Sequence, residues 1–443
     1  MNQPTLTADF IIQPGWIISM EPGEAVLSEH AIAVENGRIK AVLPNSQLPD
    51  DLGIERLELP EHVVLPGLVN AHGHAAMSLL RGFADDLPLM PWLENHIWPA
   101  ETAHMSEQFV HDGTSLAMAE MLLSGTTTFC DMYFFPEVVA ALCRKTGMRA
   151  QLAAPVLDFP TAYGEGPDDY ISKALALRDD CKNLDQLHVA FGPHSPYTVS
   201  VPTLEKVALF AAELDMGVHI HLHETAGEVL SAVEATGERP LDTLRRLGLL
   251  GPRTQCVHMT SLGKQDIASL AETGAQVIHC PQSNMKLASG TCPVPELQAA
   301  GVNVALGTDG AASNNDLNMF NEMHSAALLA KLSSGDPTAM SAHRTLHMAT
   351  LGGAKALGLD QEIGSIKPGK QADLIAINLS APATQPLYNP LSQLVYACTG
   401  GEVTHSWVAG QALLQNRQLL TLDLEDTLER AKHWGRKISA TPQ

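Results

Sequence analysis

The sequence predicts a (β/α)8 barrel, the TIM-barrel type of α/β fold, with a small β-sandwich domain built from both termini. The central part of the chain alternates short apolar, strand-like runs with segments of helical length. This alternation is typical of parallel strands joined by helices. Both ends instead contain short β-prone pieces separated by turns. We therefore expect a composite domain from residues 1–64 and 366–443, and a barrel from residues 65–365.

The N-terminal end contains a strong hairpin signal. Asn36-Gly37 lies between the apolar runs Ala31–Val34 and Ile39–Val42, and this dipeptide favours a two-residue turn between antiparallel strands. Towards the C-terminus, Ala372–Ile377 and Val403–Val408 have the composition of strands. We expect antiparallel β-structure at both ends, assembled into one sandwich with the rest of the chain inserted into it.

Eight strand-like runs lie between the two ends. Their number fits a (β/α)8 barrel with insertions, somewhat larger than the typical size of about 250 residues. An open doubly wound sheet is the alternative, but no Gly-x-Gly-x-x-Gly turn follows the first run. The segment Leu80–Met105 is too long for a simple loop, so we expect it to cover the mouth of the barrel. The eight runs are residues 63–70, 126–131, 149–157, 187–192, 218–223, 255–258, 276–280 and 303–307.

Composition limits the possible partners. The chain has 49 Asp and Glu but only 27 Lys and Arg, a formal net charge of −22 at pH 7. This charge disfavours binding to nucleic acid or to an anionic membrane, and a small neutral or cationic ligand fits better. The first residues show no basic region followed by an apolar segment, and no apolar stretch is long enough to span a bilayer. We therefore expect a cytoplasmic protein.

The most informative motif is His72-Gly73-His74, at the end of the first barrel run. Alternate side chains of an extended chain share a face, so both imidazoles can reach one metal ion. An isolated His-x-His pair is more often a loop feature without a metal. Polar side chains at the ends of other runs favour the metal, because a barrel gathers the carboxyl ends of its strands on one rim. These side chains are Asp131, His194, His219, His221, His223, Glu224, His258, His279 and Asp309.

Four residues at the ends of these runs form a candidate ligand set. A Lewis-acid metal needs imidazole and carboxylate ligands with one position left open for water, and His72, His74, His221 and Asp309 would supply them. The seven cysteines form no Cys-x-x-Cys pair that could replace these ligands. His219 shares a face with His221 but lies deeper, so we expect it to be packed or hydrogen-bonded inside the barrel.

Longer motifs resemble the amidohydrolase superfamily over nearly the whole chain. They are Pro-Gly-Leu-Val-Asn-Ala-His-Gly-His at 66–74, His-Leu-His-Glu-Thr at 221–225, His-Cys-Pro-Gln-Ser-Asn at 279–284, Gly-Thr-Asp-Gly at 307–310 and Gly-x-Ile-x-Pro-Gly at 364–369. Within that superfamily, Leu-Leu-Arg-Gly at 79–82, Trp-Pro-Ala-Glu at 98–101 and Phe-Gly-Pro-His-Ser-Pro-Tyr at 191–197 resemble the 5-methylthioadenosine/S-adenosylhomocysteine deaminases.

The resemblance implies metal-dependent hydrolytic deamination of 5′-methylthioadenosine, and in some relatives of S-adenosylhomocysteine or adenosine, to the inosine analogue and ammonia. It implies one divalent metal ion per subunit, with zinc as the expected metal, because the run 187–192 ends without the lysine that bridges two metals in binuclear relatives. The same ligand set follows from it: His72, His74, His221 and Asp309. It also implies a homo-oligomer, a dimer or a tetramer.

Carried over position by position, the resemblance also implies roles in the reaction. Glu224 would deliver a proton to N1 of the purine, His258 would hold the attacking water, and Asp309 would pass the proton of the water to the leaving ammonia. Without the resemblance, Glu224 is equally well interpreted as a carboxylate at a helix start. Glu101 and His194 would hydrogen-bond the ribose hydroxyls.

One difference between this sequence and the family pattern bears on the choice of substrate. Relatives that accept S-adenosylhomocysteine bind its carboxylate with arginines after the third strand, whereas residues 153–160 contain none and Arg149 lies earlier. We therefore expect a preference for 5′-methylthioadenosine. Met90, Trp92 and Trp98 either contact the thioether or form the core of the lid. The competing hypothesis is another aminohydrolase of this scaffold that acts on a free purine or a triazine, as guanine deaminase does.

Overall fold

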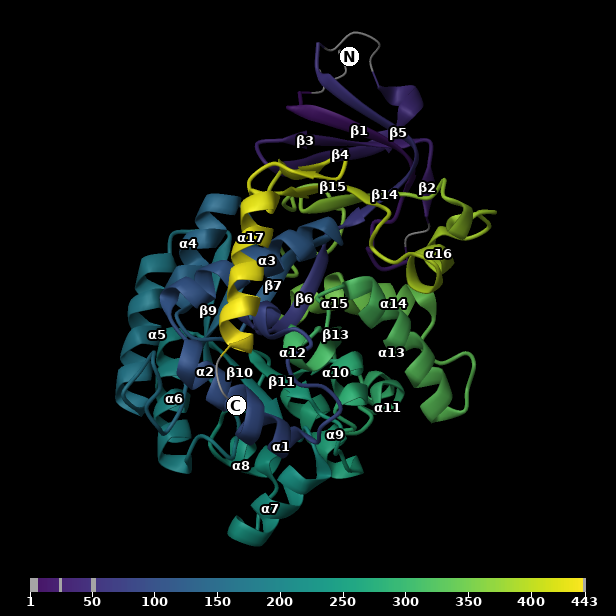
Figure 1. Cartoon of the computed structure of the whole chain (residues 1–443). Helices are drawn as coiled ribbons and strands as arrows, with labels where there is room; N and C mark the ends of the chain where they lie inside the picture. Colours follow the sequence, from purple (N-terminus) through teal and green to yellow (C-terminus); the bar gives the residue numbers. More distant parts are fainter. Residues whose placement is uncertain (1–6, 24–25, 49–52, 441–443) are drawn as a thin grey trace.

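The computed structural model describes residues 7–23, 26–48 and 53–440, which form two sheets and a layer of helices (Figure 1). The first six residues of the expected N-terminal domain lie outside these ranges. The eight-stranded sheet is surrounded by helices, and the nine-stranded sheet lies at one end of the molecule, near the N-terminus. No helix of the described residues combines the length and the hydropathy needed to cross a membrane.

The eight-stranded sheet is the predicted barrel. Its strands are all parallel and follow one another in chain order, which rules out the doubly wound alternative. The two ends of the sheet meet where the backbone N–H of Asp309 donates to the carbonyl of His72 at 3.1 Å. The strands are β6 (Leu68–Gly73), β7 (Thr126–Asp131), β8 (Arg149–Val156), β9 (Leu187–Pro193), β10 (Gly217–Leu222), β11 (Thr254–His258), β12 (Gln276–His279) and β13 (Val304–Leu306).

Glycine allows the ends of the barrel to approach each other. A Cβ atom at Gly307 would lie 2.7 Å from the backbone nitrogen of His72, a distance that no side chain can occupy. The other barrel strands are buried along most of their length, because helices cover their outer face and side chains fill the interior. The predicted runs therefore have the apolar composition of parallel strands.

Helices connect the strands and form the outer layer (Figure 1). They are α3 (Glu107–Leu123), α4 (Pro136–Thr146), α5 (Pro167–Cys181), α6 (Val201–Leu214), α7 (Ala226–Thr236), α8 (Pro240–Arg246), α9 (Lys264–Thr273), α10 (Pro281–Lys286), α11 (Val294–Ala299), α12 (Ala311–Asn314), α13 (Met319–Ser334), α14 (Ala342–Met348) and α15 (Leu351–Ala356). The segment predicted to cover the mouth contains α1 (Leu89–Trp92), a π-helical turn (Leu93–Ile97) and α2 (Trp98–His104).

The nine-stranded sheet is built from both termini, as predicted. Asn36 and Gly37 have φ values of 51° and 75° and form the expected turn between two antiparallel strands. The sheet has the order β17-β16-β15-β14-β5-β1-β3-β4, with β2 paired to β1. Its strands are β1 (Phe10–Ile17), β2 (Leu27–Ser28), β3 (His30–Glu35), β4 (Arg38–Pro44), β5 (Glu55–Pro66), β14 (Leu374–Asn378), β15 (Val403–Val408), β16 (Gln411–Gln415) and β17 (Gln418–Leu419).

Two details of this domain differ from the sequence prediction. The sheet is mixed, because β1 and β5 run parallel. The sandwich-like packing comes from one sheet that folds over itself: the ring of Phe10 on β1 stacks on Trp407 of β15, with centroids 6.5 Å apart. The backbone N–H of Ala372 also donates to the carbonyl of Gly37 at 2.9 Å. This hydrogen bond joins the turn between β3 and β4 to the segment just before β14, although β3 and β14 are not neighbours in the strand order.

The predicted run 63–70 combines the end of β5 with the start of β6, because the chain passes from one sheet to the other at Gly67. β5 therefore extends to Pro66, beyond the predicted boundary at residue 64. The C-terminal helix α17 (Leu424–Ser439), assigned to the composite domain, packs on α3 of the barrel (Figure 1). Its Trp434 donates from Nε1 to Asp112 at 3.0 Å. The domain boundaries as such stay a prediction.

Candidate active site

A cavity of about 1590 Å3 opens at the carboxyl ends of the barrel strands. The segment Leu80–Met105 forms one wall of it, through Met90, Trp92, Trp98 and Glu101, so this segment covers the mouth as predicted. His72 is fully buried just beneath the cavity. The other predicted site residues line it: His74, Glu101, His194, His221, Glu224, His258 and Asp309.

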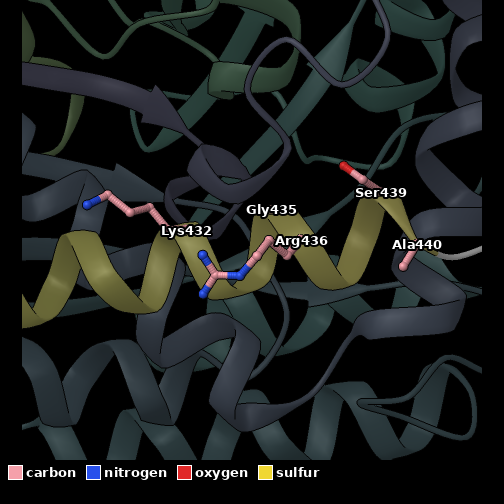
Figure 2. Close-up of a pocket in the computed structure, with 5 residues that line it drawn as sticks. All are labelled: Lys432, Gly435, Arg436, Ser439 and Ala440. Atoms are coloured by element: carbon pink, nitrogen blue, oxygen red, sulfur yellow. The ribbon is translucent and has the colours of Figure 1, made fainter.

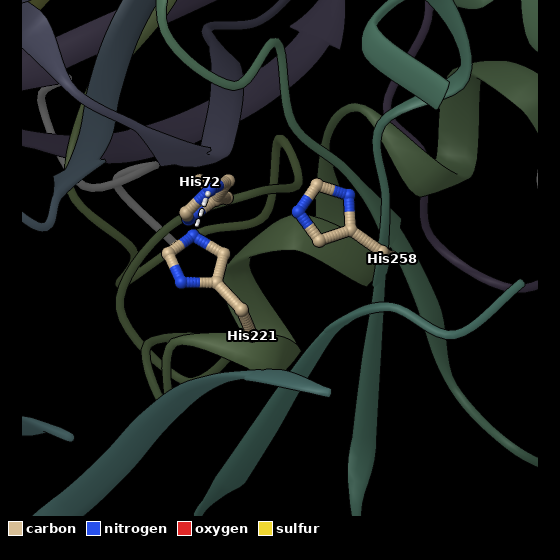
Figure 3. A group of neighbouring side chains, drawn as sticks. All are labelled: His72, His221 and His258. Carbon is tan, nitrogen blue, oxygen red and sulfur yellow. Dashed lines mark hydrogen bonds between the residues drawn. The ribbon is translucent and has the colours of Figure 1, made fainter. Parts of the chain in front are cut away.

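The side chains predicted to bind a metal lie together. Nε2 of His221 is 3.2 Å from Nε2 of His72, and Oδ1 of Asp309 is 3.4 Å from Nε2 of His72 and 3.3 Å from Nε2 of His74. Possible ligand atoms of His72, His221 and His258 also lie within 4.8 Å of one another. Figure 3 shows the rings of these three histidines turned toward one another from β6, β10 and β11.

In His74 and His221, the hydrogen bond made by Nδ1 leaves the other ring nitrogen, Nε2, free to bind a metal ion. Nδ1 of His74 donates to the carbonyl of Met132 at 2.6 Å, and Nδ1 of His221 donates to the carbonyl of His194 at 2.8 Å. These bonds fix the tautomer and leave Nε2 with a free lone pair, which is how a protein orients imidazole ligands. Burial lowers the pKa of His221 well below its usual value, which favours the neutral form that binds metal. The donor set therefore fits a divalent metal ion.

His72 has its partner inside the barrel. Its Nδ1 is 2.8 Å from Nε2 of His219, and Nδ1 of His219 is 2.6 Å from Oε1 of Gln255. His219 is thus the hydrogen-bonded barrel histidine that its depth predicts, and it holds His72 by a relay of hydrogen bonds. Sequence reasoning did not identify Gln255, because a glutamine inside an apolar strand carries no signal for its partner.

Asp309 and His258 are also held by side chains that sequence reasoning did not single out. Ser283 and Ser313 donate to Oδ2 of Asp309 at 2.6 and 3.1 Å, which leaves Oδ1 to face the histidines. Asn284 lies 2.9 Å from Nδ1 of His258. Ser283 and Asn284 belong to the motif at 279–284. That motif is the feature of the sequence from which their place at the site could have been predicted.

Glu224 extends into the cavity beside His258, with Oε2 3.8 Å from Nε2 of that histidine. Burial raises the pKa of Glu224, which favours the protonated carboxyl group. The backbone at these strand ends is in the left-handed region, with φ of 51° at His223, 73° at His258 and 64° at Asp309. Such conformations are costly for residues other than glycine and gather where a side chain must be aimed at a site.

The two residues predicted to bind ribose line the cavity from different elements, α2 and the end of β9. Glu101 of α2 accepts a hydrogen bond from the hydroxyl of Tyr133 at 2.5 Å, and burial raises its pKa to about 7. Nδ1 of His194 lies 3.0 Å from Oγ1 of Thr198. Burial lowers the pKa of His194 to about 4, so the ring is neutral.

Besides His219, three side chains from the predicted rim do not reach the cavity wall. His223 turns away, with Nδ1 donating to Ser261 and Nε2 accepting from the backbone of Leu241. His279 is buried at the end of β12. Asp131 accepts from the backbone N–H of Ala75 at 2.7 Å and so holds the chain that follows His74. A one-residue change along a strand end is enough to redirect a side chain.

A second hollow lies on the surface of α17. Figure 2 shows the residues that form it, which belong to that helix and to the position directly after it: Lys432, Gly435, Arg436, Ser439 and Ala440. None of the predicted site residues belongs to it. The chemistry of the sequence motifs is therefore confined to the barrel mouth.

Comparisons with known proteins agree with this geometry. A model of the amidohydrolase family matches residues 63–413, and a model of the NagA composite domain matches residues 22–60. A 5-methylthioadenosine/S-adenosylhomocysteine deaminase of Teredinibacter turnerae is 51% identical over 437 residues, which cover 98% of this chain and 99% of the relative. A protein of the same name from Saccharophagus degradans is 50% identical over 434 residues, which cover 98% and 97%.

Among solved structures, the crystal structure of an adenosine deaminase from Xanthomonas campestris with bound zinc has a TM-score of 0.96 and 49% sequence identity. The match covers 98% of this chain and 99% of that one. Both the catalytic barrel and the terminal sheet are thus shared. The chain belongs to the amidohydrolase family, within its group of 5-methylthioadenosine/S-adenosylhomocysteine deaminases.

Proposed function

We propose that this protein is a hydrolase that deaminates 5′-methylthioadenosine to the inosine analogue and ammonia. The observation that carries the proposal is the convergence of His72, His74, His221 and Asp309 at the mouth of a barrel. The relatives at 50 and 51% identity bear the name of deaminases for this nucleoside. The chain would act as a homo-oligomer in the cytoplasm, two expectations that stay predictions.

His72, His74, His221 and Asp309 would hold one divalent ion per subunit, and we expect zinc, because imidazole and carboxylate ligands suit it. A metal at this position would supply Lewis-acid activation of a water molecule. His258 is not needed for a complete ligand set. Its Nε2 faces the same space, so we assign it the role of accepting a hydrogen bond from the water and directing it toward C6 of the purine.

The carboxyl groups would move the protons. Glu224, whose pKa is raised by burial, would deliver a proton to N1 of the ring while the tetrahedral centre forms at C6. Asp309 would take one proton of the attacking water and pass it to the departing ammonia, and the other proton, on the new C6 hydroxyl, would return to Glu224 as the C6 carbonyl forms. The serines on Oδ2 of Asp309 keep its other oxygen turned toward the reacting atoms.

The nucleoside part would be bound by Glu101 and His194. One oxygen of Glu101 accepts from Tyr133, and the other is available to the ribose hydroxyls. A free purine or triazine has no ribose for this pair to bind, which makes the competing function less suited to the cavity.

The proposal is tested by an ammonia-release screen on protein of measured metal content. The substrates are 5′-methylthioadenosine, adenosine, S-adenosylhomocysteine, adenine, guanine and an amino-triazine. We expect turnover of the adenine nucleosides and little of the free bases. Turnover of guanine or of the triazine without turnover of any nucleoside would favour the competing function. Metal-loaded protein that releases no ammonia from any of them would contradict both.

A further inference from the structure

A carboxylate in the first turn of α7 binds the backbone that carries Glu224. Oε1 of Glu228 accepts from the N–H of His223 at 3.0 Å, and its Oε2 accepts from the N–H of Glu224 at 2.7 Å. Thr225 is the N-cap of α7 and accepts from the N–H of Glu228 at 3.1 Å. In an ordinary capping box, the acidic side chain binds the N–H of the N-cap residue. The carboxylate of Glu228 instead accepts from the N–H groups of His223 and Glu224, the two residues before the N-cap.

Glu228 supplies the acceptor for the two N–H groups of this bend, whereas the carbonyl of His223 is held separately by the N–H groups of Thr260 and Ser261 at 3.0 and 3.2 Å. His223 has a left-handed φ of 51°, which is costly for a histidine, and successive N–H groups in such a bend point the same way and suit one anion. On the other side of Glu224, Oγ1 of Thr260 donates to its carbonyl at 2.7 Å. The peptide groups before and after Glu224 are thus both fixed, and these bonds set the direction of its side chain into the cavity.

We propose that Glu228 is a positioning residue that holds the backbone of Glu224, so that the carboxyl group of Glu224 reaches the purine ring. The inference rests on the proposed function for the role of Glu224. α7 projects from the barrel (Figure 1), and Val229 is its one buried residue. The two hydrogen bonds that Glu228 accepts therefore link an otherwise exposed helix to the backbone of Glu224.

The first test is E228Q, which keeps the size of the side chain. The amide NH2 cannot accept a hydrogen bond from a backbone N–H, so one of the two bonds is lost. We expect kcat for 5′-methylthioadenosine to fall about 10- to 100-fold, the effect of a small displacement of a catalytic group. KM, metal content and Tm should stay near those of the parent. E234Q, on an exposed residue of the same helix, is the matched control and should behave as the parent.

A double variant separates positioning from a general structural role. If Glu228 acts through Glu224, E228Q should lower kcat by less than twofold when it is added to E224Q. If the kcat of the double variant instead falls by the product of the two single losses, the proposal is overturned. A kcat of E228Q within twofold of the parent, or a loss of metal or of Tm that parallels the loss of kcat, would overturn it as well.

A readout without turnover keeps this inference separate from the proposed function. Amide hydrogen exchange should become at least tenfold faster in E228Q at whichever of His223 and Glu224 loses its bond, and both amides should stay unchanged in E234Q. Unchanged exchange at both amides would overturn the positioning role. If the parent turns over a different aminopurine in the ammonia screen, the proposed substrate is wrong, and the kcat comparisons are made on that aminopurine.

Discussion

The histidines of the site illustrate how a single hydrogen bond decides what a residue can do. His74 and His221 donate from Nδ1 to backbone carbonyls, so the rigid barrel itself fixes their tautomers. His72 and His258 have side-chain partners at Nδ1 instead, His219 and Asn284. All four present Nε2 to the same space. The roles of metal ligand and water holder must therefore be separated by experiment on individual residues.

Substitution of His221 and His258 separates these two roles. We expect His221→Ala to lose most of the bound metal and all activity, since a ligand is removed. His258→Ala should keep its metal while kcat falls about 100-fold or more, in the range of general acid–base contributions. Metal content by elemental analysis beside kcat is the measurement. If His258→Ala loses metal as His221→Ala does, His258 is a ligand and the assignment is wrong.

Glu101 provides a second test at the residue scale. Glu101→Ala removes the carboxylate proposed to bind the ribose, and we expect kcat/KM for 5′-methylthioadenosine to fall about 10- to 100-fold, the range of one or two lost hydrogen bonds to a charged group. Glu94→Ala, at an exposed position of the same segment, is the control and should keep the parental value. Full turnover by Glu101→Ala would remove the support for a nucleoside substrate.

Among the elements, α17 shows a contact that the sequence pattern could not predict. Its Arg430 and Trp434 bind the carboxylate of Asp112 on α3, each at 3.0 Å. Burial raises the pKa of Asp112, but hydrogen bonds from Gln108, His111, Trp434 and Arg430 outweigh it, so the pKa lies below its ordinary value of 3.8. The ionised carboxylate therefore favours the docked helix.

The pH dependence of α17 docking follows from this shift. The folded pKa is depressed, so the stabilisation is fully present above pH 3.8 and is lost as the pH falls through the folded value. We expect Asp112→Asn to destabilise the docked helix by about 1–3 kcal/mol, equally at pH 8 and pH 5, with the difference shrinking below about pH 4. Hydrogen exchange of residues 424–439 measures this, with Asp180→Asn as an exposed control. A difference that grows on acidification would contradict the assignment.

Much of the element pattern could be predicted from the sequence. The barrel strands are buried on both faces and thus apolar, and their ends carry polar residues, so both signals coincide at β7, β10 and β11. The passage from β5 to β6 was missed because both strands are apolar and Gly67 alone separates them. The orientation of His223 and His279 was missed because backbone dihedrals at strand ends, which a sequence pattern does not report, decide where a side chain points.

At the scale of the whole molecule, the charge of the cavity bears on the choice of substrate. Four carboxyl groups line it, those of Glu101, Glu224, Glu228 and Asp309. No lysine or arginine is found in its lining, as far as the described residues go. Arg149, the cation nearest in sequence to the third strand's end, is buried at the other end of β8, where it binds Asp373 at 2.8 Å.

A substrate carboxylate would thus enter a buried, acidic site without a partner, at a cost of several kcal/mol for an unpaired charge. 5′-Methylthioadenosine carries no such group, whereas S-adenosylhomocysteine does. We expect kcat/KM to favour 5′-methylthioadenosine by at least tenfold. The analogue of S-adenosylhomocysteine that lacks the carboxylate but keeps the amine is the control for size, and it should recover most of the loss. Equal kcat/KM values for the two natural nucleosides would show that charge does not set the preference. A low kcat/KM for the analogue without the carboxylate would show the same.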